Sequence, residues 1–191
     1  KRYKFEGFKP ESKEIVKDTF QSHCIVGTES YNLTSDLRLP MVLLCNILGG
    51  SSMNSRLNMS LRERNGIVYN VESSYTPYTD TGIFTVYFGT ERSNLYRALH
   101  LVEHEFDLLR DKKLGPQQLS KAKKQLIGQL AIANENREEL MLTIGRSFLY
   151  FNKVDTLPVV FEKIEKISAE DMFTVANEML DKERLSKLIF L

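Results

Sequence analysis

The stretch over residues 48–90 constrains the fold of this chain more than any other part of the sequence. Gly49 and Gly50 end whatever structure precedes them, because glycine weakens a continuing helix. Two runs with strand character follow, Ile67–Tyr75 and Ile83–Gly89, and the segment between them contains Pro, Asp and Gly. Two strand-like runs joined in this way predict a β-hairpin with a long loop.

A short helix is predicted between the glycine pair and the hairpin. Its apolar face repeats every four residues, at Met53, Leu57 and Leu61. The two serines that follow the glycine pair, Ser51 and Ser52, can cap its first turn. Gly66 suits the left-handed residue that ends a helix. Arg62 is therefore expected at the end of this helix, seven residues before Tyr69 in the first strand of the hairpin.

The rest of the chain predicts one α+β domain. Residues 1–18 are polar with little periodicity and are expected to form an N-terminal arm or the end of a linker, while residues 19–191 form a single domain. Strands are expected at 19–31 and 185–191, and helices at 37–48, 94–112, 116–133, 138–151, 156–166 and 168–181. Few strands with many helices predict a mixed, largely antiparallel sheet with helices packed on one face.

Composition excludes several classes of function. The net charge of +1 lacks the basic footprint of a nucleic-acid-binding protein. No apolar run approaches the ~20 residues that a membrane-spanning helix needs. Cys24 and Cys45 lie in apolar runs and are expected to be buried thiols, not a disulfide framework. The chain begins Lys-Arg-Tyr and not with Met, so we expect it to be a piece of a longer or processed protein.

The segment Leu61–Tyr69, with the sequence LRERNGIVY, resembles the LRE-x-x-G-x-x-Y segment of the pitrilysin/insulinase family of zinc peptidases. The resemblance is to the carboxy-terminal half of a processing-peptidase-like member, the half that carries no metal. The glycine pair, the turn Asp80–Gly82 and the Leu-then-Lys run Leu119–Leu126 also resemble that half. The similarity follows the same order over nearly the whole chain.

The resemblance implies a role for Arg62 and Tyr69. In this family the matching residues contact the peptide near the scissile bond, and a forked Arg donor and a Tyr hydroxyl suit that task. Arg64 lies close enough in sequence to share the role. The implied partners are an extended peptide substrate, which adds as a strand to a sheet edge, and an amino-terminal metal-binding domain. A second copy of the chain is a further option.

No cofactor is expected in this chain, because the resemblance places Zn in the partner domain. We therefore expect the chain to be part of a zinc metalloendopeptidase and inactive alone. The alternative is a non-catalytic scaffold or assembly subunit of the same fold, since some members of the fold have lost the peptidase activity. A metal motif in the partner domain would favour the enzyme.

A third hypothesis is an autonomous zinc peptidase. His100, Glu103 and His104 match H-x-x-E-H, the inverted zinc motif of the same family. Glu178, 74 residues after His104, lies near the family's spacing for a third ligand, although Asp171 and Asn177 are equally placed polar neighbours. The three motif residues fall opposite the apolar face of their predicted helix, however. We therefore interpret them as a solvent-facing polar stripe and expect no metal there.

Overall fold

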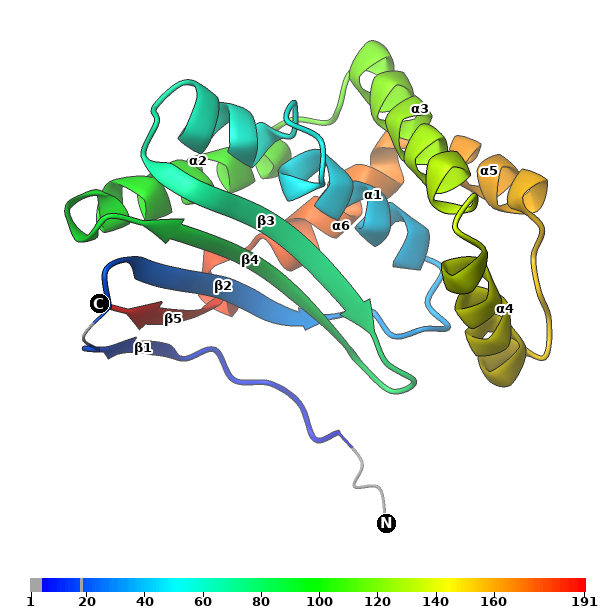
Figure 1. The fold of residues 1–191 in the computed structure, drawn as a ribbon, viewed down its shortest axis with the longest axis horizontal. Helices are drawn as coiled ribbons and strands as arrows, with labels where there is room; N and C mark the ends of the chain where they lie inside the picture. The colour runs from blue at the N-terminus through cyan, green and yellow to red at the C-terminus, as the bar shows by residue number, and fades with distance from the viewer. Residues whose placement is uncertain (1–4, 18) are drawn as a thin grey trace.

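Five strands form one mixed sheet in the computed structural model, which describes residues 5–17 and 19–191 (Figure 1). The strands are β1 (Ser12–Ile15), β2 (Ser22–Ser30), β3 (Val68–Pro77), β4 (Gly82–Thr90) and β5 (Ser186–Phe190). They lie in the order β1-β5-β2-β4-β3. Only β1 and β5 run parallel, and the other neighbours are antiparallel. The predicted α+β fold with a mixed, largely antiparallel sheet is confirmed.

The helices lie on one side of this sheet or beyond its end (Figure 1). The α-helices are α1 (Arg38–Gly49), α2 (Leu95–Asp111), α3 (Pro116–Ala133), α4 (Arg137–Phe151), α5 (Leu157–Glu165) and α6 (Ala169–Met179). Shorter turns of helix are η1 (Asn58–Glu63), η2 (Arg92–Asn94) and η3 (Lys182–Arg184). In the described part of the chain, no helix combines the length and apolar character that crossing a bilayer would require.

The core lies between the sheet and the helices α1, α2 and α6. Alternation along the strands directs Phe84, Val86 and Phe88 of β4 inward, where each side chain is fully buried. Phe106 of α2 meets Phe84 with ring centroids 6.4 Å apart. Helix α1 is largely covered, since seven of its residues are buried. The core is therefore built from segments at both ends of the chain.

The predicted hairpin is confirmed, although its strands extend to Pro77 and Gly82, so the loop that joins them is shorter than expected. Strands β3 and β4 pair from Val68 opposite Thr90 to Pro77 opposite Gly82. The predicted left-handed end of the preceding helix is also confirmed, because Gly66 has φ +62°. The buried thiols are confirmed as well, since Cys24 and Cys45 are both buried and free.

The helix before the hairpin differs from its prediction. It begins after residue 55 instead of at Ser51, so Met53 lies outside it and 65% of its surface is exposed. Leu57 and Leu61 are fully buried, as expected. The Ser52 hydroxyl does not cap this helix, because it accepts a hydrogen bond from Gln129 Nε2 of α3 at 2.9 Å. A contact with a distant helix has replaced the local cap.

The N-terminal segment contains a strand that the sequence did not predict. Within residues 1–18, expected to be an arm or a linker end, β1 pairs with the final strand from Ser12 opposite Lys187 to Ile15 opposite Phe190. Residues 1–4 and 18 of this segment lie outside the described part of the structure. The described part of the segment thus contributes an edge strand to the sheet.

Candidate functional site

Arg62 and Tyr69 project from one corner of the molecule, where η1 turns into β3. The carbonyl of Arg62 accepts a hydrogen bond from Gly66 N at 2.9 Å, and the carbonyl of Leu61 accepts one from Ile67 N at 3.0 Å. These two bonds fold the chain back on itself. Tyr69 follows Ile67 by two residues, which is about 7 Å of extended chain. The turn therefore holds the backbone segments that carry both predicted side chains close together.

Two departures from regular backbone structure mark this corner. Arg62 lies in η1, which has π-helical hydrogen bonding. Tyr69 lies at a bulge in β3, because Val68 pairs with Thr90 while Asn70 pairs with the adjacent Gly89. Short π-helical segments are frequent at functional sites, and β-bulges re-aim side chains at the ends of strands. Each of the two predicted residues therefore lies within one such irregularity.

The Tyr69 hydroxyl faces a carboxylate. Tyr69 is 55% exposed, and its hydroxyl donates a hydrogen bond to Glu91 Oε1 at 3.2 Å. This bond and the negative charge of Glu91 raise the pKa of Tyr69 above its usual value, because both disfavour the phenolate. In this arrangement the hydroxyl is a hydrogen-bond donor. Sequence reasoning missed Glu91, although the hairpin register places it one residue beyond the partner of Val68.

Two arginines at this corner are available to a ligand. Arg62 and Arg64 are both exposed, and no described residue forms a hydrogen bond or ion pair with either guanidinium. A third arginine is used structurally, since Arg97 Nη2 of α2 donates to Asn65 Oδ1 at 2.9 Å. That bond ties the turn between η1 and β3 to the following helix. The structure therefore presents Arg62 and Arg64 as alternatives.

Strand β3, which begins at this corner, lies at one edge of the sheet. Its outer edge has no strand partner in the described part of the chain. Two hydrogen bonds connect the strand, and the residue before it, to neighbouring elements. Ser73 Oγ donates to the carbonyl of Cys45 in α1 at 2.6 Å, and the Thr90 hydroxyl donates to the carbonyl of Ile67. An edge strand without a partner can accept an extended peptide by backbone hydrogen bonds.

The H-x-x-E-H residues are not arranged as a zinc site. Glu103 is ion-paired with Lys187 Nζ of β5 at 2.5 Å, while His100 and His104 are exposed on α2. Glu178 instead accepts a hydrogen bond from the Tyr31 hydroxyl at 2.6 Å. Lys187, the partner of Glu103, pairs across the sheet with Val26 of β2. Tyr31, the partner of Glu178, follows Val26 by five residues, which is ~16 Å of extended chain.

The donor set therefore does not fit a zinc ion. Across the described residues, no group of three His, Cys, Asp or Glu side chains is placed to hold a metal. Asp171 and Asn177, the other polar neighbours considered from the sequence, serve local structure. Asp171 completes the capping box with Ser168 at the start of α6, and Asn177 donates to the carbonyl of Phe173 at 2.9 Å.

The chain matches a known family of domains. The model described as "Peptidase M16 inactive domain" matches residues 2–126. A protein of Bacillus subtilis described as the uncharacterized zinc protease YmxG is 26% identical over 95% of this chain and 44% of its own length. An uncharacterized zinc protease of Streptomyces coelicolor is 30% identical over 88% of this chain and 36% of its own length. The chain thus spans less than half of these relatives.

Solved structures share the fold. A peptidase M16 inactive domain from Pseudomonas fluorescens superposes with a TM-score of 0.84 at 20% identity, over 95% of this chain and 43% of that chain. A chain of complex III2 from Candida albicans superposes with a TM-score of 0.80 at 19% identity, over 95% of this chain and 45% of that chain. At these identities the likeness establishes the fold alone.

Proposed function

Because this chain belongs to the family of peptidase M16 inactive domains, we propose that it is the substrate-binding half of a zinc metallopeptidase. A separate, homologous domain would supply the zinc, since in the described part of this chain no group of His, Cys, Asp or Glu side chains is placed to hold that ion. The two halves together would enclose the peptide. The observation that carries the proposal is the corner where the turn at Gly66 brings the backbone segments of Arg62 and Tyr69 together at the start of the edge strand β3, with both side chains exposed.

Each group at the corner has a task in this proposal. The guanidinium of Arg62 binds a peptide carbonyl through its forked donors. The Tyr69 hydroxyl releases Glu91 and donates a hydrogen bond to the carbonyl oxygen of the scissile bond as negative charge develops on it. The edge of β3 holds the extended peptide in register by backbone hydrogen bonds. Peptide binding and the stabilisation of charge are thus both assigned to this half.

Turnover by the assembled peptidase tests these assignments. We expect Arg62→Ala and Tyr69→Phe each to lower kcat/KM by a factor of about ten or more, because each removes one donor to the reacting peptide. Zinc per assembled enzyme, measured by elemental analysis, should not change. The Arg64→Ala variant distinguishes the two exposed arginines, since only the one that contacts the peptide should affect turnover.

Tyr96→Phe is the matched control. Tyr96 is 59% exposed and, like Tyr69, donates its hydroxyl to a carboxylate, that of Glu14 at 3.0 Å. It lies on α2 and outside the proposed peptide path, so turnover should stay near that of the unchanged enzyme. Wild-type turnover in both Arg62→Ala and Tyr69→Phe would refute the assigned roles.

An assembly subunit without catalytic function is the second candidate. It is favoured by the likeness to a chain of complex III2, whose fold this chain shares. In that case, the corner would have no substrate to bind. Substitutions at Arg62 and Tyr69 would then leave proteolysis by any assembly unaffected, while loss of the chain would reduce the amount of assembled complex.

A further inference from the structure

Helix α4 leaves its apolar side chains in solvent. None of its 15 residues is buried, although from Leu140 to Phe151 the only charged residue is Arg146. Its large apolar side chains are exposed, among them Met141, Ile144, Phe148, Leu149 and Tyr150. A contiguous exposed apolar surface normally marks a site of interaction, because water does not stabilise it. Something outside the described domain is therefore expected to cover α4.

Local contacts are present at both ends of α4. Its first turn is capped by Asn136, whose Oδ1 accepts hydrogen bonds from Glu138 N at 3.1 Å and Glu139 N at 3.3 Å. At its last residue, the guanidinium carbon of Arg38 lies 5.2 Å from the ring centre of Phe151. The cap stabilises the helix itself, and the Arg38 contact connects its last turn to α1.

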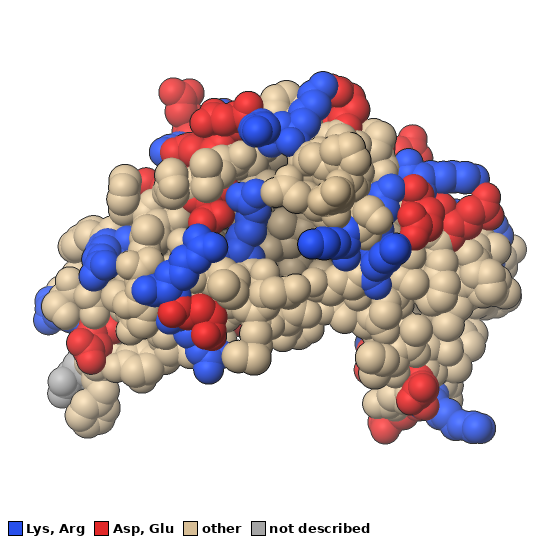
Figure 2. Space-filling model, turned by 90° about the horizontal axis from the view of Figure 1, so that it is seen from above, with Lys and Arg blue, Asp and Glu red and all other residues tan. Residues whose placement is uncertain are grey.

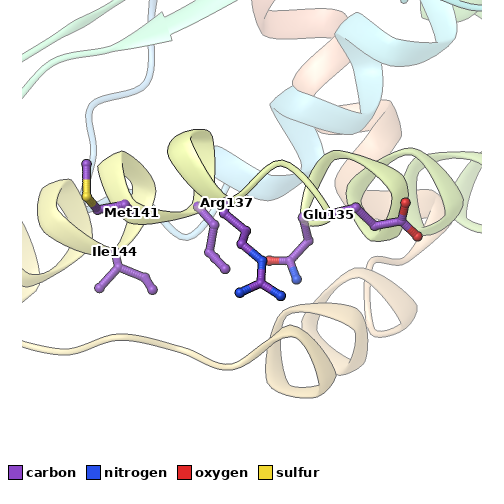
Figure 3. A pocket seen from close by; sticks show the side chains of 6 residues that line it. Glu135, Arg137, Met141 and Ile144 are labelled. Atoms are coloured by element: carbon purple, nitrogen blue, oxygen red, sulfur yellow. The ribbon is translucent and has the colours of Figure 1, made fainter.

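A pocket of about 720 Å³ opens beside the elbow between α3 and α4 (Figure 3). The apolar part of its lining comes from Leu140, Met141 and Ile144 of α4. Glu135 and Arg137 add charges of both signs at the elbow (Figure 3). Figure 2 shows this end of the molecule from above as a projecting lobe with broad uncharged surface. Apolar surface with a charged rim is typical of protein interfaces.

The occupant follows from the length of the relatives. YmxG and the Streptomyces protein carry more than half of their chains outside the matched region. The described domain, by contrast, closes its own core without any residue of α4. We infer that α4 and the elbow pocket are the docking surface for the metal-bearing half of the peptidase. This inference rests on the proposed function, because it takes that half as the partner.

The docking surface is separate from the peptide-binding corner. Strand β3 begins beside η1 and α2, whereas α4 lies beyond the opposite end of the strand (Figure 1). Substitutions on α4 should therefore change association between the halves without touching Arg62 or Tyr69. The two proposals can consequently fail independently of each other.

Binding between the halves tests the inference. The metal-bearing half-domain, produced as a separate polypeptide, is titrated with the 191-residue chain by calorimetry. We expect Met141→Glu to raise Kd at least about tenfold, because it buries an unpaired charge in the interface. Phe148→Glu should act in the same direction. Since Met141 is 64% exposed in the chain alone, neither the circular dichroism spectrum nor the Tm of the chain should change.

Met53→Glu is the matched control, because Met53 is 65% exposed and its neighbours Ser52 and Asn54 are bonded to α3 and not to α4. It should leave Kd within about twofold of that of the unchanged chain. Three results would overturn the inference: no binding between the unchanged halves, unaltered Kd in both α4 variants, or equal weakening by Met53→Glu. Self-association of the chain that Met141→Glu abolishes and the metal-bearing half does not displace would assign α4 to a second copy instead.

Discussion

Tyr69 and Glu91 define the chemistry of the proposed site at the scale of single residues. The Tyr69 phenol donates a hydrogen bond to the carboxylate of Glu91, so this carboxylate competes with the peptide for that bond. The sequence resemblance singled out Tyr69 but not Glu91. The partner is supplied by the register of a hairpin, which a linear motif does not record.

The Tyr69–Glu91 contact predicts a change in pH dependence. Glu91→Gln removes the carboxylate that raises the pKa of Tyr69, so that pKa should fall toward the usual value for tyrosine. Ultraviolet absorbance of the phenolate during an alkaline titration measures this, with Tyr69→Phe identifying the contribution of this residue. In the unchanged chain, Tyr69 should ionise at higher pH than in Glu91→Gln. An unchanged Tyr69 pKa in the variant would show that the hydrogen bond does not persist in solution.

The turn between η1 and β3 decides, at the scale of elements, whether the two side chains share one corner. Gly66 adopts φ +62°, where a side chain is strained by about 1–2 kcal/mol. Gly66→Ala should therefore lower the free energy of unfolding by roughly that amount in urea denaturation. It should also lower turnover in the assembled enzyme, because the backbone that carries Arg62 and Tyr69 shifts.

Gly128→Ala is the control for that prediction. Gly128 lies inside α3, and nothing lies within 4 Å of the position that a Cβ would take. Alanine favours a helix interior over glycine by roughly 0.5–1 kcal/mol, so this variant should be more stable than the unchanged chain. Equal stability of both variants would mean that the left-handed turn is not maintained in solution.

Local patterns predicted most elements, and distant contacts explain the exceptions. The hairpin and the left-handed Gly66 follow from spacing and turn chemistry, and the structure confirms both of them. Ser52 instead bonds to Gln129, 77 residues away, which no local rule could anticipate. Strand β1 was missed for the same reason, since its pairing partner β5 lies at the other end of the sequence.

The candidate site was less accessible to sequence reasoning than the fold. Arg62 and Tyr69 were identified by resemblance, and no periodic pattern distinguishes them from other exposed residues. The sequence did not reveal the exposure of α4 either, because Leu140, Ile144 and Phe148 have the spacing of a helix with a buried face. Spacing reports that an apolar face exists but not whether a separate domain covers it.

At the scale of the whole molecule, a sheet carries helices on one face, with the corner proposed to bind the peptide at one end and the exposed helix α4 at the other (Figure 1). This arrangement suits the proposed half of a peptidase. The proposed function assigns the binding of the peptide to this chain and the catalytic metal to its partner. On α2, His100 and His104 are exposed as expected, whereas Glu103 is half-buried and ion-paired with Lys187 of β5.

Zinc bound per chain tests this division most directly. The 191-residue chain is dialysed without chelator and its zinc content is determined by elemental analysis, with His104→Ala in parallel. The account predicts zinc near zero in both proteins, because Glu103 and Glu178 are held apart by Lys187 and Tyr31. About one zinc per chain, lost in His104→Ala, would contradict it and show that this chain carries its own catalytic metal.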